Sequence, residues 1–287
     1  MEHALIDLHI HSTASDGCRT PAELVAMAAE RKLAAAALTD HDTVAGLDEF
    51  LRAAENSGVT AVPGVEISTT FDHREVHIVG LFIDHHSVQL NVFLNEIRTQ
   101  RHERNLKIIS KLQERGYDIS LEEAAALAGG DVVGRPHIAR VLFEKYEEFT
   151  TLQDVFDKLL KKGRPAYASR SLTTPVEAIR QIHAAHGVAV WAHPIFRQPN
   201  EYQWCRKAIK YLKHAQLDAL EVYYSSFNSD QTDALRNYAA EFELAMSGGS
   251  DYHGATLNEV QMGIGNGGLR VPYEFYETLC SLAEKYR

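Results

Sequence analysis

Histidine and carboxylate side chains recur where the short apolar, strand-like runs of this sequence end. Imidazole nitrogens and carboxylate oxygens bind divalent ions such as Zn²⁺, Mn²⁺ and Fe²⁺, and no cysteine belongs to the pattern. The candidate ligands are His9, His11, Asp16, His41, Glu66, His77, His193, Asp251 and His253. They exceed what one ion uses, so we expect about two to three divalent ions, with Glu66 as their bridge. Clustered metal ions catalyse hydrolytic displacement at phosphorus or carbon.

Each ligand motif alone has a more ordinary explanation. His9 and His11 lie two residues apart on one strand, so they share a face and could close on one cation, but such pairs are usually coincidences of packing. His41 could equally stand at the start of a helix, where Asp40 or Thr43 would cap the first turn. Taken singly, Glu66 could be a solvated surface acid, His77 a core histidine and His193 a loop residue. The joint occurrence of these strand ends favours a metal centre.

The remaining histidines fall mostly on predicted helix faces or in loops, and we do not expect them to bind metal. They are His3, His73, His85, His86, His102, His183, His186 and His214. The pair His183 and His186 has the H-x-x-H spacing but lacks the glutamate of a zincin helix.

Strand-like runs alternate with amphipathic helical stretches along most of the chain, a pattern typical of parallel β/α architecture. Seven strands are expected, at 5–9, 35–39, 59–63, 75–82, 187–192, 217–222 and 244–248. Thr20 and Pro21 mark one helix start, with Thr20 as the cap. Active sites of β/α barrels lie at the carboxyl ends of the strands, where the candidate ligands stand. The sequence therefore predicts an α/β fold with a seven-stranded barrel.

Strand signals stop between Asn91 and Ser171, where the sequence is typical of several helices. We expect a helical insertion at 91–171 that packs on a barrel formed by 1–90 and 172–287, because no flexible linker separates the two. One predicted helix of the insertion carries a row of basic residues: Arg98, Arg101, Arg104, Lys107, Lys111 and Arg115. This row could be an RNA track, but a solvated helix face is the commoner outcome.

The net charge narrows the classes of function. The 29 Lys and Arg against 39 Asp and Glu give −10, which argues against a basic protein held on nucleic acid by counterion release. A phosphorylated ligand would need a local positive source, which bound cations could supply. The cysteines are widely spaced, and no apolar run approaches the roughly 18 residues of a membrane span. We therefore expect a cytoplasmic protein without disulfides, membrane anchor or obligate protein partner.

Six motifs occur in order along the chain: H-x-H, T-D-H, G-x-E, H-x-x-G, A-H-P and S-D-x-H. Together they make the chain resemble the PHP (polymerase and histidinol phosphatase) family of metal-dependent phosphoesterases. The stretches DLHIHSTASDGCRTPAELV, LTDHDT, VPGVEIS and GGSDYH look most similar to the bacterial branch of RNase AM and the 3′,5′-nucleotide bisphosphate phosphatases. The resemblance implies a distorted (β/α)7 PHP barrel, a trinuclear metal site and Mn²⁺ as the ion.

The resemblance also distributes the ligands over the ions. It places His9, His11, Glu66 and Asp251 on the first ion, Glu66, His77 and His193 on the second, and Asp16, His41 and His253 on the third. Asp16 stands where other branches carry a histidine. Glu66, Asp251 and His253 are implied as catalytic residues, with Glu66 as the bridge and Asp251 or His253 as the proton donor.

For the substrate, the resemblance implies that the helical insertion helps to bind phosphates. VVGRPHIAR resembles a phosphate-contacting stretch and nominates Arg135 and His137, while KKGRPAY places Arg164 where the branch usually has lysine. Both arginines stand beside a glycine in predicted helix-start loops, which suit anions; each could instead be a solvated surface charge. The branch has A-H-P-G-R-Y where this chain has AHPIFRQ, so Arg197 is displaced by one position.

The expected activity is hydrolysis of 3′,5′-bisphosphonucleosides such as pAp, or of short 5′-phosphorylated RNA from its 5′ end. Two further kinds of function stay open. One is another hydrolase, either a histidinol-phosphate-type phosphatase or an amidohydrolase, although no lysine ends a strand here to serve as a bridging carbamate. The second is a PHP module without catalysis that binds or regulates a partner, against which the complete ligand set counts.

Overall fold

The structure is a computed structural model that describes residues 5–128, 132–169, 173–195, 201–254 and 260–287. Its strands form one sheet in the order β7-β6-β5-β4-β3-β2-β1-β8. Their bounds are Leu5–Ile10 (β1), Ala35–Leu38 (β2), Thr60–Phe71 (β3), Arg74–Leu81 (β4), Val188–Ala192 (β5), Ala219–Tyr224 (β6), Ala245–Gly249 (β7) and Val271–Pro272 (β8). Each strand expected from the sequence is present, although β3 runs on to Phe71.

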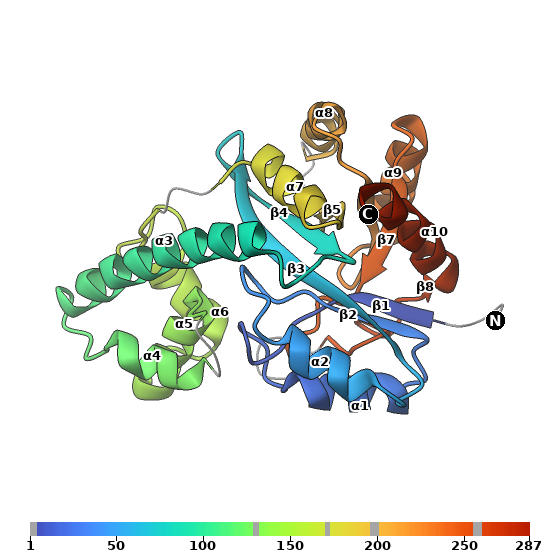
Figure 1. The fold of residues 1–287 in the computed structure, drawn as a ribbon. Coiled ribbons are helices and arrows are strands. Elements are labelled where there is room, and N and C mark those ends of the chain that lie inside the picture. Colours follow the sequence, from blue (N-terminus) through green and yellow to red (C-terminus); the bar gives the residue numbers. More distant parts are fainter. Residues whose placement is uncertain (1–4, 129–131, 170–172, 196–200, 255–259) are drawn as a thin grey trace.

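Helices surround the sheet and extend away from it on one side (Figure 1). Their bounds are Pro21–Glu30 (α1), Leu47–Ala54 (α2), Val88–Gln113 (α3), Leu121–Leu127 (α4), Arg135–Lys145 (α5), Leu152–Val155 (α6), Phe156–Leu160 (η1, a π-helix), Pro175–Ala184 (α7), Glu201–His214 (α8), Ser229–Glu241 (α9), Tyr273–Ala283 (α10) and Glu284–Tyr286 (η2, a 3₁₀ helix). The expected cap of α1 is confirmed: the side chain of Thr20 accepts the backbone N–H of Glu23, and Pro21 opens the helix.

The two ends of the sheet meet, so the strands form a nearly closed barrel. Four neighbouring strand pairs are parallel, whereas β4 runs antiparallel to both β3 and β5. Beyond β7, the backbone N–H of Asp251 donates to the carbonyl of His9 on β1 over 2.8 Å. Gly249 permits this approach, because a Cβ there would lie 2.3 Å from the Cβ of His9. The closure brings candidate ligands from the first and last strands together.

The expected seven-stranded barrel of repeated β/α units is wrong in two respects. First, β3 and β4 form a hairpin: the turn residues Asp72 and His73 have φ values of 50° and 60°, which is the left-handed backbone of a tight type I′ turn. Second, an eighth strand, Val271–Pro272, pairs antiparallel with β1. Two residues are too few to produce a periodic signal in the sequence.

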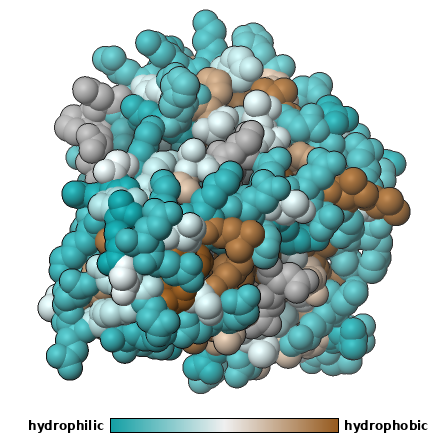
Figure 2. Space-filling model, turned by 90° about the vertical axis from the view of Figure 1, so that its left-hand side faces the viewer, coloured by the Kyte–Doolittle hydropathy of each residue, from teal (hydrophilic) through white to brown (hydrophobic). Residues whose placement is uncertain are grey.

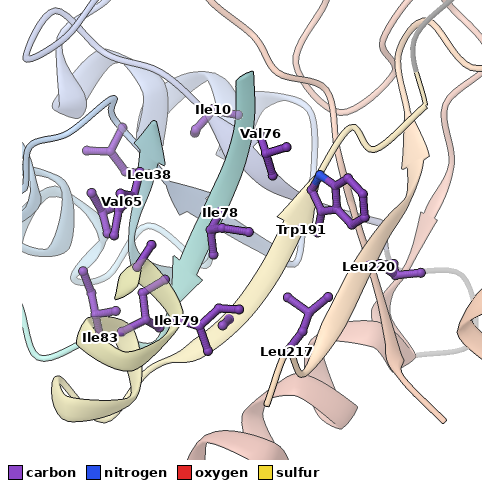
Figure 3. Packing of buried hydrophobic residues seen from close by; sticks show 14 of the residues in the cluster. Ile10, Leu38, Val65, Val76, Ile78, Ile83, Ile179, Trp191, Leu217 and Leu220 are labelled. Atoms are coloured by element: carbon purple, nitrogen blue, oxygen red, sulfur yellow. The ribbon is translucent and has the colours of Figure 1, made fainter. Parts of the chain in front are cut away.

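Apolar side chains from the strands and the surrounding helices form the main core. Figure 3 shows Val65, Ile78 and Trp191, from three neighbouring strands, packed together with Ile179 of α7. A second buried cluster joins the strands to α10 through Phe275. Burial contributes about 1.5–3 kcal/mol for each large apolar side chain. The strand ends that carry the candidate ligands therefore rest on a well-packed base.

The helices α3 to α6 and η1, between β4 and β5, have an apolar cluster of their own that includes Ile108, Leu142 and Leu160. They extend to the left of the barrel in Figure 1, and Figure 2 looks onto this side, where hydrophobic residues gather near the middle of a mainly hydrophilic surface. We call this part the helical block. Its predicted limits, 91–171, stay a prediction, because position 171 lies outside the described residues. None of the described helices is long and apolar enough to cross a membrane.

Candidate metal centre

The candidate ligands expected from the sequence converge at one end of the barrel. They come from β1, β3 and β4 and from the segments that follow β1, β2, β5 and β7. Glu66 on β3 stands at the centre of the group and is fully buried. Its two carboxylate oxygens face different sets of imidazoles. Glu66 therefore joins ligands that come from distant parts of the chain.

The Oε2 atom of Glu66 faces three imidazole nitrogens. It lies 3.3 Å from Nε2 of His9, 3.3 Å from Nε2 of His11 and 2.9 Å from Nδ1 of His41. Asp251 joins this set, with Oδ1 at 3.4 Å from Nε2 of His9 and 3.1 Å from Nε2 of His11. The set formed by Glu66, Asp251 and the H-x-H pair offers ligand atoms that all lie within 4.8 Å of one another. Four such atoms can surround one ion.

The Oε1 atom of Glu66 faces a second set of imidazoles. It lies 2.8 Å from Nδ1 of His77 and 3.0 Å from Nε2 of His193. Ligand atoms of His41, Glu66 and His77 also lie within 4.8 Å of one another. Because its two oxygens point to separate sets, Glu66 has the geometry of a carboxylate that bridges two ions.

A third set surrounds Asp16, in the loop after β1. Its Oδ1 lies 3.2 Å from Nε2 of His253, and its Oδ2 lies 3.8 Å from Nε2 of His41. Nδ1 of His11 is 3.9 Å from Oδ1 of Asp16, and these four residues offer ligand atoms within 4.8 Å of one another. The three residues expected together are together, and His11 stands between the first and third sets.

Several buried polar atoms of the centre form no hydrogen bond within the described part of the chain. They are Nε2 of His9, both ring nitrogens of His11, Nδ1 of His41, Nε2 of His77 and Oε2 of Glu66. A buried polar atom without a partner costs about 1–3 kcal/mol. These nitrogens and oxygens lie close together without hydrogen-bond geometry, an arrangement that a shared cation satisfies. The residues therefore fit divalent metal ions bound through nitrogen and oxygen.

The charged groups of the centre shift one another's pKa. Burial opposes charge on Glu66, but the imidazoles of His41 and His77 outweigh it and hold the pKa of Glu66 well below its ordinary value. Burial likewise opposes charge on the imidazoles, yet Glu66 raises the pKa of His77 to about 10, and Asp16 raises the pKa of His253 to about 10. The carboxylates thus create a strong local demand for positive charge, which bound cations can meet.

Glu221 on β6 supports the centre and was missed in the sequence. It is buried, its Oε1 lies 2.9 Å from Nδ1 of His9, and its Oε2 accepts the backbone N–H of His193 over 2.7 Å. When the Nδ1–H of His9 donates a hydrogen bond to Glu221, the unprotonated Nε2 is left as the metal-binding atom. The available signal was an acid inside an apolar strand run, at 217–222, but no motif accompanies it.

Asp251 is held in place by two neighbouring interactions. The hydroxyl of Tyr224 lies 2.9 Å from its Oδ2, and burial together with Asp251 raises the pKa of Tyr224, so that the phenol stays a donor. The preceding Ser250 donates its backbone N–H to the buried Asp7 over 2.8 Å. Asp251 itself has a left-handed φ of 56°, a strained conformation that the surroundings must enforce.

The interpretation of His41 as the start of a helix is wrong. The next helix, α2, starts only at Leu47, and no side chain caps it. Asp40, which could have been that cap, instead accepts the backbone N–H of Ser12 over 2.8 Å. His41 pairs with Glu66 in a short parallel bridge, so its position is set by the barrel.

Arg135, the first residue of α5, reaches toward the centre through a carboxylate. Its Nη2 lies 3.2 Å from Oε2 of Glu75, whose Oε1 lies 3.6 Å from Nε2 of His77. Two contacts thus separate this predicted phosphate-binding residue from a candidate ligand.

His137 lies in the same turn of α5 and is buried. Its Nδ1 accepts the backbone N–H of Gly134 over 3.0 Å, and burial lowers its pKa. Gly134 in turn lies against the third set, since a Cβ there would be 3.7 Å from Oδ2 of Asp16. Arg164 is exposed in a turn, and its predicted role stays a prediction. Arg197 lies outside the described residues.

The basic row on α3 is neither an open track nor a wholly solvated face. Arg101 and Arg104 are buried. Nη2 of Arg101 bonds to Oδ2 of Asp42, and Nη1 of Arg98 donates to the carbonyl of Asp42 over 3.1 Å. Since Asp42 follows His41 directly, these arginines tie the helical block to the metal centre.

The chain is similar to known proteins over most of its length. Residues 7–169 match the family model described as the PHP domain. The chain is 38% identical to a 5′-3′ exoribonuclease of Haemophilus influenzae, over 86% of this chain and 89% of the relative. It is 35% identical to a 3′,5′-nucleoside bisphosphate phosphatase of Chromobacterium violaceum, over 87% of each. A solved structure from Bifidobacterium adolescentis, assigned as a metal-dependent phosphoesterase, superposes with a TM-score of 0.83 at 25% identity, over 98% of this chain and 97% of that one.

Proposed function

The chain belongs to the PHP domain family and is a phosphoesterase, and on this basis we propose that it hydrolyses phosphate esters of nucleotides. The substrates are 3′,5′-bisphosphonucleosides such as pAp and short 5′-phosphorylated RNA, attacked from its 5′ end. The observation that carries the proposal is the position of Glu66, whose buried oxygens face separate sets of imidazoles. A module without catalysis has no use for such a complete ligand set.

In this proposal the centre holds three divalent ions, with Mn²⁺ as the ion. The ligands are His9, His11, Glu66 and Asp251 for the first, Glu66, His77 and His193 for the second, and Asp16, His41 and His253 for the third. When bound, such ions stabilise charge on phosphoryl oxygens and activate water for in-line displacement. The proposed ligands include three carboxylates, so three divalent ions leave the centre positive even when the neighbouring Glu221 is counted. An acidic chain can thereby attract an anionic substrate.

In this proposal, residues of the chain position the substrate and deliver a proton to the leaving oxygen. Arg135 exchanges its contact with Glu75 for a substrate phosphate, to which a guanidinium can bind through two parallel hydrogen bonds. The helical block, with proposed limits 91–171, acts as a cap that presents this arginine. The proton that the attacking water loses would pass through Asp251, held by Tyr224, or through His253 to the leaving oxygen.

Substrate profiling tests the proposed function. The purified protein with Mn²⁺ is assayed on pAp, short 5′-phosphorylated RNA, the same RNA without its 5′-phosphate, histidinol phosphate and p-nitrophenyl phosphate. We expect kcat/KM to be highest for pAp and 5′-phosphorylated RNA, and chelation to abolish turnover. A clear preference for histidinol phosphate, or binding of nucleotides without turnover, would refute the proposal.

The cap role of Arg135 is tested by Arg135→Ala. A hydrogen bond between charged partners contributes about 1.5–3 kcal/mol, so kcat/KM for pAp should fall by about 10–150-fold at about 1.4 kcal/mol per factor of ten. The matched control is Arg140→Ala, in the same helix, because within the described residues the side chain of Arg140 hydrogen-bonds along the helix, to Glu144 over 2.8 Å. p-Nitrophenyl phosphate lacks the second phosphate, so kcat/KM for this substrate should fall much less. Equal losses on both substrates would show that Arg135 acts on folding or on the transferred phosphoryl group.

A further inference from the structure

A second group of metal-ligating side chains lies outside the centre described above, between α2 and the turn that leads into α3. It consists of Asp48, in the first turn of α2, and the consecutive residues His85 and His86. One ligand atom from each of the three lies within 4.8 Å of the other two. No sequence motif marks this group, because the carboxylate and the imidazoles are far apart along the chain.

The separations within the group suit one small ion. Oδ1 of Asp48 lies 3.0 Å from Nε2 of His85 and 3.8 Å from Nε2 of His86. Tetrahedral Zn²⁺ has ligand bonds of about 2.0–2.2 Å, which places neighbouring ligand atoms roughly 3.3 Å apart. The observed separations lie on both sides of that value, so modest side-chain rotation brings all three atoms onto one ion.

Side-chain hydrogen bonds hold the backbone of the turn that carries both histidines. Oδ1 of Asp84 accepts the backbone N–H of His86 over 3.0 Å, and Nδ2 of Asn91 donates to the carbonyl of His85 over 2.8 Å. Side-chain hydrogen bonds of this kind restrict the turn before any ligand binds. Less conformational entropy is then lost when a ligand does bind.

A hydrogen bond between Asp48 and His85 accounts for that pair alone, but it does not account for His86. The side chain of His86 is 72% exposed and free to turn to solvent, yet its Nε2 faces the same carboxylate oxygen. Its ring centroid lies 4.0 Å from that of His85. Two imidazoles that share one carboxylate oxygen form the donor set of a transition-metal site.

We propose that Asp48, His85 and His86 bind one divalent transition-metal ion, with Zn²⁺ preferred and water in the remaining position. Imidazole and carboxylate ligands without thiolate suit Zn²⁺, and three protein ligands leave one position open. The ion links α2 to the start of α3. It therefore fastens the segment that follows His41 to the start of the helical block.

Metal content provides the test. The wild-type protein, His86→Gln and Asp48→Asn are saturated with Mn²⁺, dialysed against Zn²⁺ and subjected to elemental analysis. The matched control is His214→Gln, which changes an exposed histidine at the end of α8. Exchange of Zn²⁺ into the catalytic centre affects all four proteins equally. We expect the wild type and His214→Gln to hold about one more ion per chain than the other two; equal metal content in all four would overturn the proposal.

Thermal unfolding gives a second readout. An ion that binds only the folded chain raises its unfolding temperature. Zn²⁺ should therefore raise the unfolding temperatures of the wild type and His214→Gln more than those of His86→Gln and Asp48→Asn. Phosphoesterase activity with Mn²⁺ should be the same in all four, because none of the changed residues belongs to the catalytic centre. If Asp48→Asn lowers the unfolding temperature equally with and without Zn²⁺, the group is an ion pair only and the proposal is wrong.

Discussion

Replacing Glu221 by glutamine is expected to weaken metal binding without unfolding the barrel. Glu221 receives two buried hydrogen bonds, from Nδ1 of His9 over 2.9 Å and from the backbone N–H of His193 over 2.7 Å. A glutamine side chain has one acceptor oxygen and one NH₂ group. Whichever way the amide turns, one of the two donors therefore faces another donor, and either His9 or the backbone of His193 loses its orientation.

The expected magnitude follows from the lost bond. A hydrogen bond to a charged acceptor contributes about 1.5–3 kcal/mol. At about 1.4 kcal/mol per factor of ten, this amounts to a loss of about 10–150-fold in metal affinity. Replacing a residue that orients a metal-bound histidine usually lowers metal affinity or activity by about 10–100-fold, so the two magnitudes agree.

The assay is a titration of the metal-free protein with chelator-buffered Mn²⁺, followed by turnover of pAp. For Glu221→Gln we expect a higher Mn²⁺ requirement, with most of the turnover restored at saturating Mn²⁺. Glu221→Asp keeps two acceptor oxygens on a shorter side chain and should lie between the variant and the wild type. If the Mn²⁺ affinity of Glu221→Gln equals that of the wild type, or if saturating Mn²⁺ restores nothing, Glu221 does not orient these ligands.

Three further substitutions test other parts of the structure. Glu66→Gln should lower kcat by more than about 100-fold with the fold retained, because a neutral amide bridges cations poorly and several kcal/mol of metal-borne stabilisation is lost; turnover within a few-fold of the wild type at matched metal content contradicts the bridge. Gly249→Ala should cost about 1–3 kcal/mol or more of unfolding free energy, since its Cβ would lie 2.3 Å from that of His9; an unchanged chemical-denaturation midpoint argues against the close approach. Asp42→Asn leaves the buried Arg101 without its charged partner and should lower the unfolding free energy by about 3–5 kcal/mol, measured by chemical denaturation. Adding Arg101→Met should recover part of that loss. If nothing is recovered, the two residues do not stabilise the fold as an ion pair.

The sequence predicted which side chains would converge because their placement follows a local rule. Strand ends can be recognised from short apolar runs, and the residues at those ends meet at one edge of a barrel whatever their separation along the chain. Glu66 and His193 could therefore be brought together without knowledge of the loops. The β3–β4 hairpin was missed because its turn residues, Asp72 and His73, are not the Asn-Gly or Asp-Gly pair that marks such turns.

The residues that the sequence did not predict depend on contacts between distant elements. Arg101 belongs to a row of basic residues with a few glutamates interspersed, and nothing local distinguishes it from a solvated neighbour. Only the packing of α3 against the segment after β2 gives it Asp42 as a buried partner. Glu221 is a similar case, since an acid in an apolar strand is explained only by the imidazole of His9 on another strand.

The candidate metal ligands and the proposed phosphate contact meet at the same junction between barrel and helical block. On one side, Arg101 fixes Asp42, which follows the candidate ligand His41. On the other side, Glu75 lies between Arg135 and His77, at 3.2 Å from the former and 3.6 Å from the latter. In the proposed function, a phosphate that takes Arg135 away from Glu75 strengthens the attraction between that carboxylate and the imidazole of His77. If His77 binds a cation and Arg135 a phosphate as proposed, this coupling is reciprocal, so a change that strengthens one of the two binding events strengthens the other by the same factor.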